Sequence, residues 1–345
     1  MLKTHKLICG MVFCLALALV FVSCAKKGQA EFEKGKAAFD AKEYQTAAKQ
    51  FETAAEQGHA EAQYYAGLCY TKGYGVERDE EKAFKWYSKA ADKGNAKAMC
   101  ALGFCYADGK GVEKDENEAF KLIRKAADKG DPDAMSNLGE QYLVGSPFAE
   151  RNDSKADKWF KKALEAYRKD AEKGDTYAMR RISRFYQNGF GVEKDRKESV
   201  NWIRKAAENG DLGAMNSLGR LYSGGRDVPK DMAKAVKWYR KAAESGDRNA
   251  MMELGRLFEG GREVERDLKE AVRWYGKAAE NGDRTAVYRL EEIADTNDGE
   301  IAGLAAEALK QVKTKDRSDA ADDVKSAAVE EAAQLSLGKC NEAAE

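Results

Sequence analysis

Residues Ala271 to Asp283 read AVRWYGKAAENGD, and close copies of this stretch occur along most of the chain. Ala235 begins AVKWYRKAAESGD, Ser199 begins SVNWIRKAAENGD and Ala119 begins AFKLIRKAADKGD. The glycines that close the copies are separated by 36 residues in every interval but one, which is 44 residues: Gly58, Gly94, Gly130, Gly174, Gly210, Gly246 and Gly282. A fixed period of this size predicts a solenoid, in which each repeat buries its apolar face only against its neighbours.

Each repeat carries the start and stop signals of two helices. An Asp or Asn that can cap a helix begins the first helix (helix A), and a second Asp begins the helix that ends in Lys-Ala-Ala and a glycine (helix B). With only three prolines in 345 residues, the sequence predicts an all-helical chain. The expected parts are a leader at 1–24, a shorter repeat at 25–58, six repeats at 59–94, 95–130, 131–174, 175–210, 211–246 and 247–282, capping helices at 283–313, and an acidic, flexible tail at 314–345.

Three motifs recur within the six long repeats: Ala-x-x-x-Leu-Gly-x-x-Tyr, Gly-x-Gly-Val-x-x-Asp and Ala-x-x-Trp-Tyr-x-Lys-Ala-Ala. Together they resemble the Sel-one-like repeat (SLR), a relative of the tetratricopeptide repeat, whose pattern the 25–58 segment resembles. The resemblance implies a right-handed α/α solenoid that acts as a non-enzymatic adaptor between proteins. Asp227 and Glu263 replace the second loop glycine and Ser183 replaces the helix-A glycine. These departures predict altered loops in the last two repeats.

The 44-residue repeat has one of its eight extra residues in the loop Gly145 to Trp159 and the other seven after Trp159, in helix B. Trp159 to Gly174 is seven residues longer than Trp238 to Gly246. Because seven residues are about two helical turns, helix B can lengthen and keep the same face inward. The sequence predicts a protruding helix end near Glu165.

The first residues have the pattern of an export signal. Lys3 and Lys6 precede an apolar run at 7–22, which is too short for an ordinary membrane span. The following Val22-Ser23-Cys24 resembles a bacterial lipobox, in which Cys24 is diacylated. This resemblance implies a lipoprotein of the bacterial envelope, in the outer membrane or facing the periplasm. The alternative is a secreted protein cleaved after Ala25.

Catalytic, cofactor and metal sites have little support in the sequence. His59 is the only histidine beyond the leader, so no multi-histidine metal site and no histidine-based catalysis is expected. Lys+Arg and Asp+Glu are equal at 59, which gives no general attraction to nucleic acid. Cysteine-rich SLR relatives have been linked to β-lactams, and Ser336-x-x-Lys339 matches one motif of β-lactam enzymes without its partners. A hydrolase or binder of cell-wall ligands is therefore the alternative function.

Two recurrent residue types are expected to be structural. All five tryptophans occupy one helix-B position, which predicts packing between helices rather than a cofactor platform. Cys69 and Cys105 occupy equivalent positions in adjacent repeats. Stacked helices place such positions about 8–10 Å apart, beyond the roughly 7 Å limit of a disulfide, so both are expected to be core residues.

The helix-A surface lines the concave side in tetratricopeptide-like solenoids and is the predicted partner-binding groove. Its candidate residues are Tyr64, Leu68, Phe104, Arg180, Arg184, Arg220 and Arg256. The early groove is apolar and the late groove is rich in arginine, which binds carboxylates in a bidentate manner. The sequence therefore indicates an extended acidic peptide of a protein partner. The alternative is that the arginines are merely solvated and Phe104 packs internally.

Overall fold

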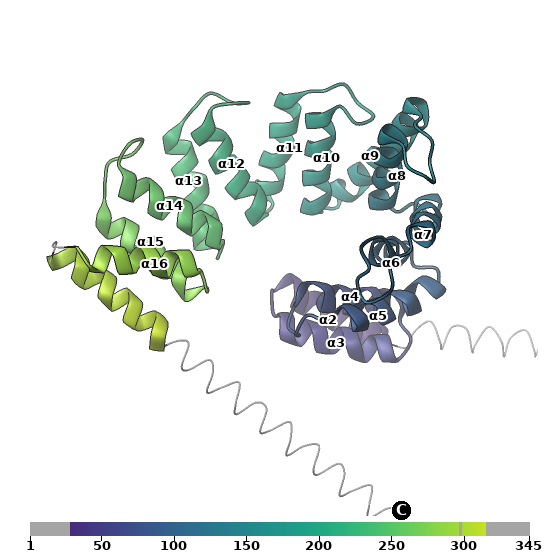
Figure 1. Ribbon diagram of the computed structural model, residues 1–345, viewed down its shortest axis with the longest axis horizontal. Helices are drawn as coiled ribbons and strands as arrows, with labels where there is room; N and C mark the ends of the chain where they lie inside the picture. The colour runs from purple at the N-terminus through teal and green to yellow at the C-terminus, as the bar shows by residue number, and fades with distance from the viewer. Residues whose placement is uncertain (1–27, 297–298, 315–345) are drawn as a thin grey trace, which may run out of the picture. The chain divides into compact units, whose positions relative to one another are not determined.

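The computed structural model describes residues 28–296 and 299–314 (Figure 1). The predicted leader with Cys24, and the tail beyond residue 314, lie outside the described residues. Over the described ranges the regular secondary structure is helical, with one isolated bridge between Ser146 and Ala149. No helix among these residues has both the length and the apolar character that a membrane span needs.

The chain divides into two compact units. The first unit comprises the described residues up to Asp170 and the loop Gly189–Glu193, and the second comprises Ala171–Asn188 and the described residues from Lys194 onward. Helices of the first unit are α2 (Gln29–Asp40), α3 (Tyr44–Glu56), α4 (Ala60–Lys72), α5 (Glu80–Asp92), α6 (Ala96–Asp108), α7 (Glu116–Asp128), α8 (Pro132–Val144) and α9 (Asp153–Glu172), of which α9 ends just past the boundary. Helices of the second unit are α10 (Thr176–Asn188), α11 (Arg196–Glu208), α12 (Leu212–Gly224), α13 (Met232–Glu244), α14 (Arg248–Gly260), α15 (Leu268–Glu280), α16 (Arg284–Ala294) and a last helix at 299–314.

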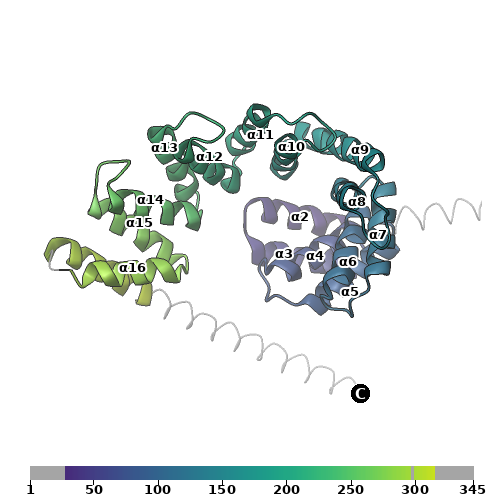
Figure 2. The same cartoon turned by 45° about the horizontal axis from the view of Figure 1, so that its top comes forward.

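Successive helices from α2 to α8 and from α10 to α16 pack against one another, and α9 meets α8 where Phe160 faces Gly139, so that helix pairs are stacked (Figures 1 and 2). Each long repeat supplies one helix A (α4, α6, α8, α10, α12, α14) and one helix B (α5, α7, α9, α11, α13, α15). This confirms the predicted all-α solenoid of helix-turn-helix repeats. The 25–58 segment contributes α2 and α3, which are joined by the turn at 41–43.

The capping signals work as the sequence predicts. Asp131 and Asp211 accept the backbone N–H groups of Ala134 and Ala214, and Asp79 does the same for a helix B at Lys82. In the first long repeat, His59 replaces the capping Asp, and its ring Nδ1 accepts the N–H of Ala62 at 3.1 Å. These bonds satisfy donors that the helix itself leaves without a partner.

A close contact between the two helices of a repeat sets their separation. The helix-A glycine faces a large side chain of helix B, as Gly67 faces Tyr87 and Gly255 faces Tyr275. A Cβ atom at Gly255 would lie 2.4 Å from the Tyr275 ring, so only glycine allows this approach. The large residue is the one directly after the tryptophan position, for example Tyr239, which is buried.

The 44-residue repeat has the longer helix B that its sequence predicts. Helix α9 contains 20 residues, whereas α5, α7, α11, α13 and α15 each contain 13. The loop Gly189–Glu193 packs on α9, where the rings of Phe190 and Phe160 stack with centroids 4.4 Å apart. The lengthened helix therefore keeps its apolar face covered.

Candidate functional site

The three residues Arg184, Arg220 and Arg256, here called the arginine ladder, lie on α10, α12 and α14 of the second unit. All three side chains are exposed. Each follows the helix-A glycine position, so each has the same place on its helix. Equivalent residues on stacked helices are about 8–10 Å apart. The ladder is thus a row of accessible guanidinium groups.

Arg220 and Arg256 of the ladder differ in whether they form an ion pair with another described residue. Arg256 is 3.4 Å from Glu253, but both side chains are exposed, so this pair holds the arginine weakly. Arg220 has no ion pair within the described part of the chain. Its guanidinium is therefore available to a ligand without the loss of an internal partner.

Arg180, which the sequence places in the groove, has a different role. Its Nε lies 3.1 Å from the carboxylate of Asp211, the capping residue of the next helix A. In the following repeat the equivalent Asn216 donates to the capping Asp247 at 3.4 Å. This position joins one repeat to the next, so Arg180 contributes to the stacking as well as to the exposed charge.

Beside Arg220 is a concave site of about 600 Å³, here called the Ser183 hollow. Its lining comes from α10 to α14 and includes Ser183, Gln187, Ser199, Ile203, Ser217, Arg220, Arg226, Asp227, Tyr239 and Glu253. Ser183 and Ser199 are only 4% and 8% exposed, and their hydroxyl oxygens are 2.9 Å apart. The hollow therefore combines buried hydroxyl groups with exposed arginines.

The sequence of the 175–210 repeat explains why a hollow exists there. Ser183 occupies the helix-A glycine position, and Ser199 occupies a position that is alanine in the other long repeats. Ile203 stands where Tyr87 and Tyr239 pack against a glycine in their own repeats. Ile203 is smaller than a tyrosine ring, and it lines the hollow together with the two serines.

In the first unit, the predicted apolar groove residues are only partly accessible. Tyr64 is half-buried against Tyr65 and Tyr87, with ring centroids 5.4 and 5.9 Å away, and burial raises the pKa of its phenol. Leu68 is also half-buried, whereas Phe104 is 40% exposed. Phe104 is thus the most accessible apolar residue of these three.

The tryptophan position is only partly buried in most of the repeats. Trp274 is 1% exposed, but Trp86, Trp159, Trp202 and Trp238 are half-buried. The ammonium group of the lysine three residues later lies over each tryptophan ring in a cation–π contact. For example, Lys205 Nζ is 4.1 Å from the centroid of the Trp202 ring. Four of the five rings are thus only partly buried, and the lysine covers part of the remaining surface of each ring.

The three cysteines that the structure describes are not arranged as reactive thiols. Cys69, Cys100 and Cys105 are free and buried, and burial raises the pKa of Cys69 to about 12 and that of Cys105 to about 11. Thiols of this kind are poor nucleophiles at neutral pH. Within residues 28–296 and 299–314, no group of three or more His, Cys, Asp or Glu side chains is arranged to hold a metal ion.

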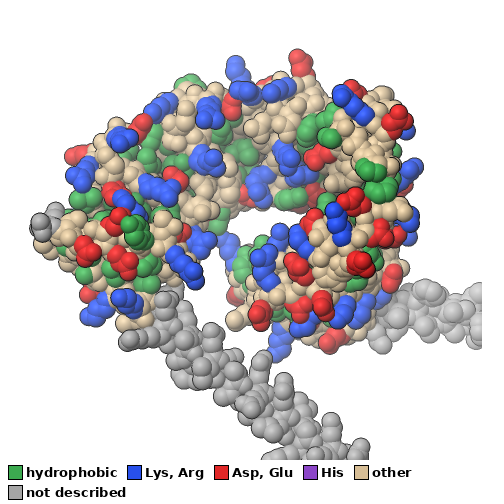
Figure 3. All heavy atoms as spheres, in the orientation of Figure 1, with side chains coloured by type: hydrophobic (Ala, Val, Ile, Leu, Met, Phe, Trp, Pro, Cys, Tyr) green, Lys and Arg blue, Asp and Glu red, His purple; other side chains and the backbone are tan. Residues whose placement is uncertain are grey.

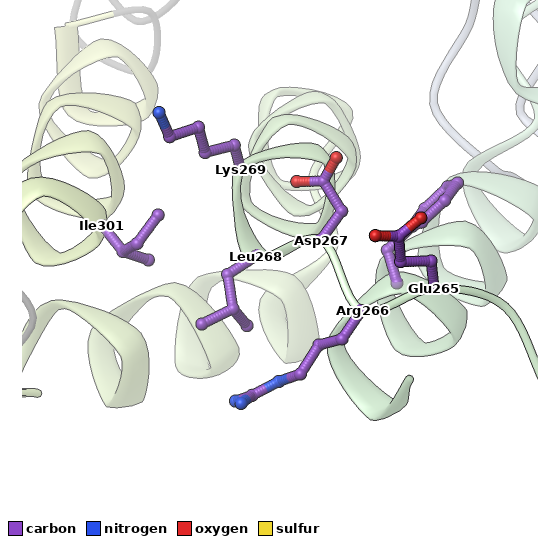
Figure 4. Close-up of a pocket in the computed structure, with 7 residues that line it drawn as sticks. Glu265, Arg266, Asp267, Leu268, Lys269 and Ile301 are labelled. Carbon is purple, nitrogen blue, oxygen red and sulfur yellow. The ribbon is translucent and has the colours of Figure 1, made fainter. Parts of the chain in front are cut away.

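A second concave site, of about 590 Å³, lies between the start of α15 and the last helix (Figure 4). Figure 4 shows Lys269 and Arg266 pointing to opposite sides of it. Lys269 pairs with Glu300 at 2.6 Å, and Arg266 donates to a backbone oxygen of α14. Asp267 caps α15. Because the fold uses these polar groups, this site offers no convergent set of ligand-binding atoms.

Charge is otherwise mixed over the surface. On the face shown in Figure 3, Lys and Arg side chains are interspersed with Asp and Glu. The arginine ladder is therefore a local feature, not part of a broadly basic surface.

Comparison with known proteins identifies the repeats. The Sel1 repeat model matches residues 60–95, 96–131, 132–166, 176–211, 213–247 and 248–283. The chain belongs to the Sel1 repeat family. Sel1 repeat proteins generally act as scaffolds for protein–protein interactions, and their solenoid fold is typically non-catalytic. The third match ends at 166, because the lengthened part of α9 exceeds the family's repeat length.

Solved structures of other Sel1 repeat proteins are similar to this chain. A Sel1 repeat protein from Oxalobacter formigenes is 37% identical, over 72% of this chain and 99% of that one, with a TM-score of 0.48. The protective antigen c5321 of uropathogenic Escherichia coli, described as having an SLR fold, is 30% identical over 86% of this chain and 71% of its own, with a TM-score of 0.37. Helicobacter pylori cysteine rich protein B is 27% identical over 39% of this chain and 96% of its own, with a TM-score of 0.32. None of the curated proteins matches the chain.

Sequence reasoning found the arginine ladder but missed the Ser183 hollow. The departure at Ser183 was visible in the sequence, yet it has this consequence only together with Ser199 and Ile203. The signal that indicates such a hollow is the pair of serines, Ser183 and Ser199, at positions that are glycine and alanine in the other long repeats.

Proposed function

We propose that the chain is a non-enzymatic scaffold that binds a protein partner through the helix-A face of its second unit, where it accepts an extended peptide bearing carboxylates. The observation that carries this proposal is the arginine ladder, with three exposed guanidinium groups at equivalent positions on α10, α12 and α14. Guanidinium groups bind carboxylates in a planar, bidentate manner.

The spacing of the ladder selects the form of the peptide. An extended chain advances about 3.3 Å per residue, and stacked helices are about 8–10 Å apart. Carboxylates at about every third residue would therefore meet successive arginines. Since the chain has no net charge, the attraction comes from this row rather than from the whole molecule.

We also propose that the protein is exported and anchored to a bacterial envelope membrane through diacylated Cys24. The support is the signal-like sequence before Cys24 and its resemblance to a lipobox. Mass spectrometry of the mature protein should find a diacylglyceryl group on Cys24. An unmodified N-terminus at Lys26 would instead support secretion.

The proposed docking face is tested with a fluorescein-labelled, amidated nonapeptide that has glutamate at every third position and alanine elsewhere. Replacing Arg184, Arg220 and Arg256 by Glu should weaken binding by about tenfold or more, because repulsion replaces attraction at each contact. The melting temperature should change little, since exposed charges contribute little to stability.

A matched control changes the same amount of charge on helix B. Lys197, Lys237 and Arg273 are exposed on α11, α13 and α15, and their replacement by Glu should leave peptide affinity near that of the wild type. Equal weakening in both triple variants would mean that only net charge matters, and full binding by the ladder variant would refute this docking face.

A further inference from the structure

The Ser183 hollow contains a hydrogen-bond donor that the fold leaves without an acceptor. Ser183 and Ser199 have two hydroxyl protons between them, and their mutual bond at 2.9 Å uses one. Neither hydroxyl makes another hydrogen bond within the described part of the chain. Both side chains are nine-tenths or more buried and line the hollow, so the remaining proton can be accepted only by an atom that enters the hollow, whether from water or from a ligand. A ligand atom entering the hollow would need to be an acceptor.

The charges around the hollow favour an anionic acceptor. Its two carboxylates already have cationic partners: Asp227 is 3.0 Å from Arg196, and Glu253 is 3.4 Å from Arg256. Its two arginines, Arg220 and Arg226, are exposed and have no ion pair within the described residues. The balance of unpaired charge at the hollow is therefore positive.

The walls between these polar groups are apolar. Val200 and Tyr239 are buried, and Ile203 and Leu221 line the same space. A ligand that carries a carboxylate on a short aliphatic stem matches both the walls and the polar groups. Glutamate has such a side chain, with two methylene groups before its carboxylate.

We propose that the Ser183 hollow is the specificity subsite of the docking face and receives one glutamate side chain of the bound peptide. The carboxylate accepts the free hydroxyl proton of the Ser183–Ser199 pair and pairs with Arg220, while the stem packs beside Ile203. A side chain is favoured over a peptide C-terminus because ladder arginines flank Arg220 on both neighbouring A helices, so the peptide continues in both directions. This assignment rests on the proposed function.

The repeat pattern itself supplies variants that are expected to fold. Ser183→Gly with Ser199→Ala introduces the residues that other repeats have at these positions and removes both hydroxyls. Ser183→Gly with Ile203→Tyr recreates the glycine–tyrosine contact of Gly219 and Tyr239 and fills the hollow. Neither variant changes the arginine ladder.

The experiment measures fluorescence anisotropy with the amidated glutamate nonapeptide, the same peptide with its central glutamate replaced by glutamine, and an all-glutamine peptide with a free C-terminus. Both variants should bind the first peptide about five- to tenfold more weakly than the wild type, as expected for loss of a hydrogen bond to a charged group. The wild type should bind the central-glutamine peptide more weakly than the first peptide by a similar factor. The two variants should bind these two peptides with nearly equal affinity. Thermal unfolding of both variants near or above the wild-type temperature confirms that they are folded.

The possible outcomes separate the two proposals. If both variants bind the first peptide as tightly as the wild type while the ladder variant loses binding, the subsite is refuted and the docking face stands. If the free C-terminus of the all-glutamine peptide gives the tighter complex, the hollow binds a terminal carboxylate and the side-chain assignment is wrong. If the wild type binds none of the three peptides, the acidic docking face and its subsite are both refuted.

Discussion

The loop from helix A to helix B contacts the preceding helix pair in two ways. In the first unit the backbone of a loop glycine packs directly against it, whereas in the second unit a charged side chain of the loop forms an ion pair with it. A Cβ atom at Gly75 would lie 2.2 Å from the backbone of Tyr44, and one at Gly111 would lie 2.1 Å from the backbone oxygen of Glu80. At the equivalent positions of the second unit, Asp227 is 3.0 Å from Arg196 and Glu263 is 2.7 Å from Lys230.

This difference shows that one stacking geometry can be reached by two kinds of contact. Gly75 and Gly111 have φ angles near +70°, which side chains rarely adopt. Asp227 and Glu263 have negative φ angles, since Lys42 is the only described residue other than glycine with a positive φ. The second unit thus has altered loops, as predicted, and joins its repeats by ion pairs where the first uses close backbone contact.

The largest expected effect is the transfer of the second unit's residue into the first. Gly111→Asp should destabilise the protein by about 3 kcal/mol, because it combines backbone strain with a clash against a main-chain atom that cannot rotate away. The reverse change, Asp227→Gly, should cost much less. The free energy of unfolding of both variants is measured by urea unfolding. A decrease of less than about 1 kcal/mol for Gly111→Asp would mean that the loop has room for a side chain.

A second comparison concerns the capping aspartates. Asp131 in the first unit is 5% exposed and has the Cys100 thiol as its neighbour, and burial raises the pKa of its carboxyl group to about 6. Asp211 in the second unit has Arg180 at 3.1 Å instead. The folded state therefore binds the proton of Asp131 more tightly than the unfolded state does, so this contribution to stability is present below about pH 4 and is lost as pH rises through about 6.

Asp131→Asn should remove this dependence and keep the cap, since Asn95 already caps the equivalent helix. The variant should be more stable than the wild type by about 1–2 kcal/mol at pH 7, with little difference near pH 4. The matched variant Asp211→Asn, which loses an ion pair, should be neutral or slightly less stable. Urea unfolding at both pH values decides, and equal effects of the two changes at pH 7 would contradict this account.

The smallest expected effect is the ion pair of the second unit's loop. In a double-mutant cycle with Arg196→Ala and Asp227→Ala, the coupling free energy should be about 0.5 kcal/mol at low salt. It should nearly vanish in about 1 M NaCl, where the screening length is roughly 3 Å. A coupling that stays above about 1 kcal/mol in high salt would indicate a rigid joint rather than an exposed pair.

Much of the fold could be predicted because the same local sequence signals recur in each repeat. The capping aspartates, the closing glycines and the seven extra residues of α9 are local signals whose meaning does not depend on distant residues. The role of the tryptophans could not be predicted in the same way. Recurrence shows that Trp238 and Tyr239 both matter, but only the packing shows that the tyrosine meets the helix-A glycine.

The candidate site was predicted only in part for a similar reason. The row Arg184, Arg220 and Arg256 follows from the period, because equivalent positions stack. The pairing of Arg180 with Asp211 depends on the distance between two repeats, and the Ser183 hollow depends on three side-chain volumes acting together. Such features arise from non-local packing, which a motif does not contain.

The most direct test of the central claim is to locate a bound peptide by photo-crosslinking. The amidated glutamate nonapeptide, with a benzophenone group in place of one alanine, is irradiated with the wild-type protein and the crosslinked fragments are identified by mass spectrometry. We expect crosslinks to α10, α12 and α14, and their loss when the unlabelled peptide competes. Crosslinks concentrated on the B helices α11, α13 and α15, or on the first unit, would contradict this claim.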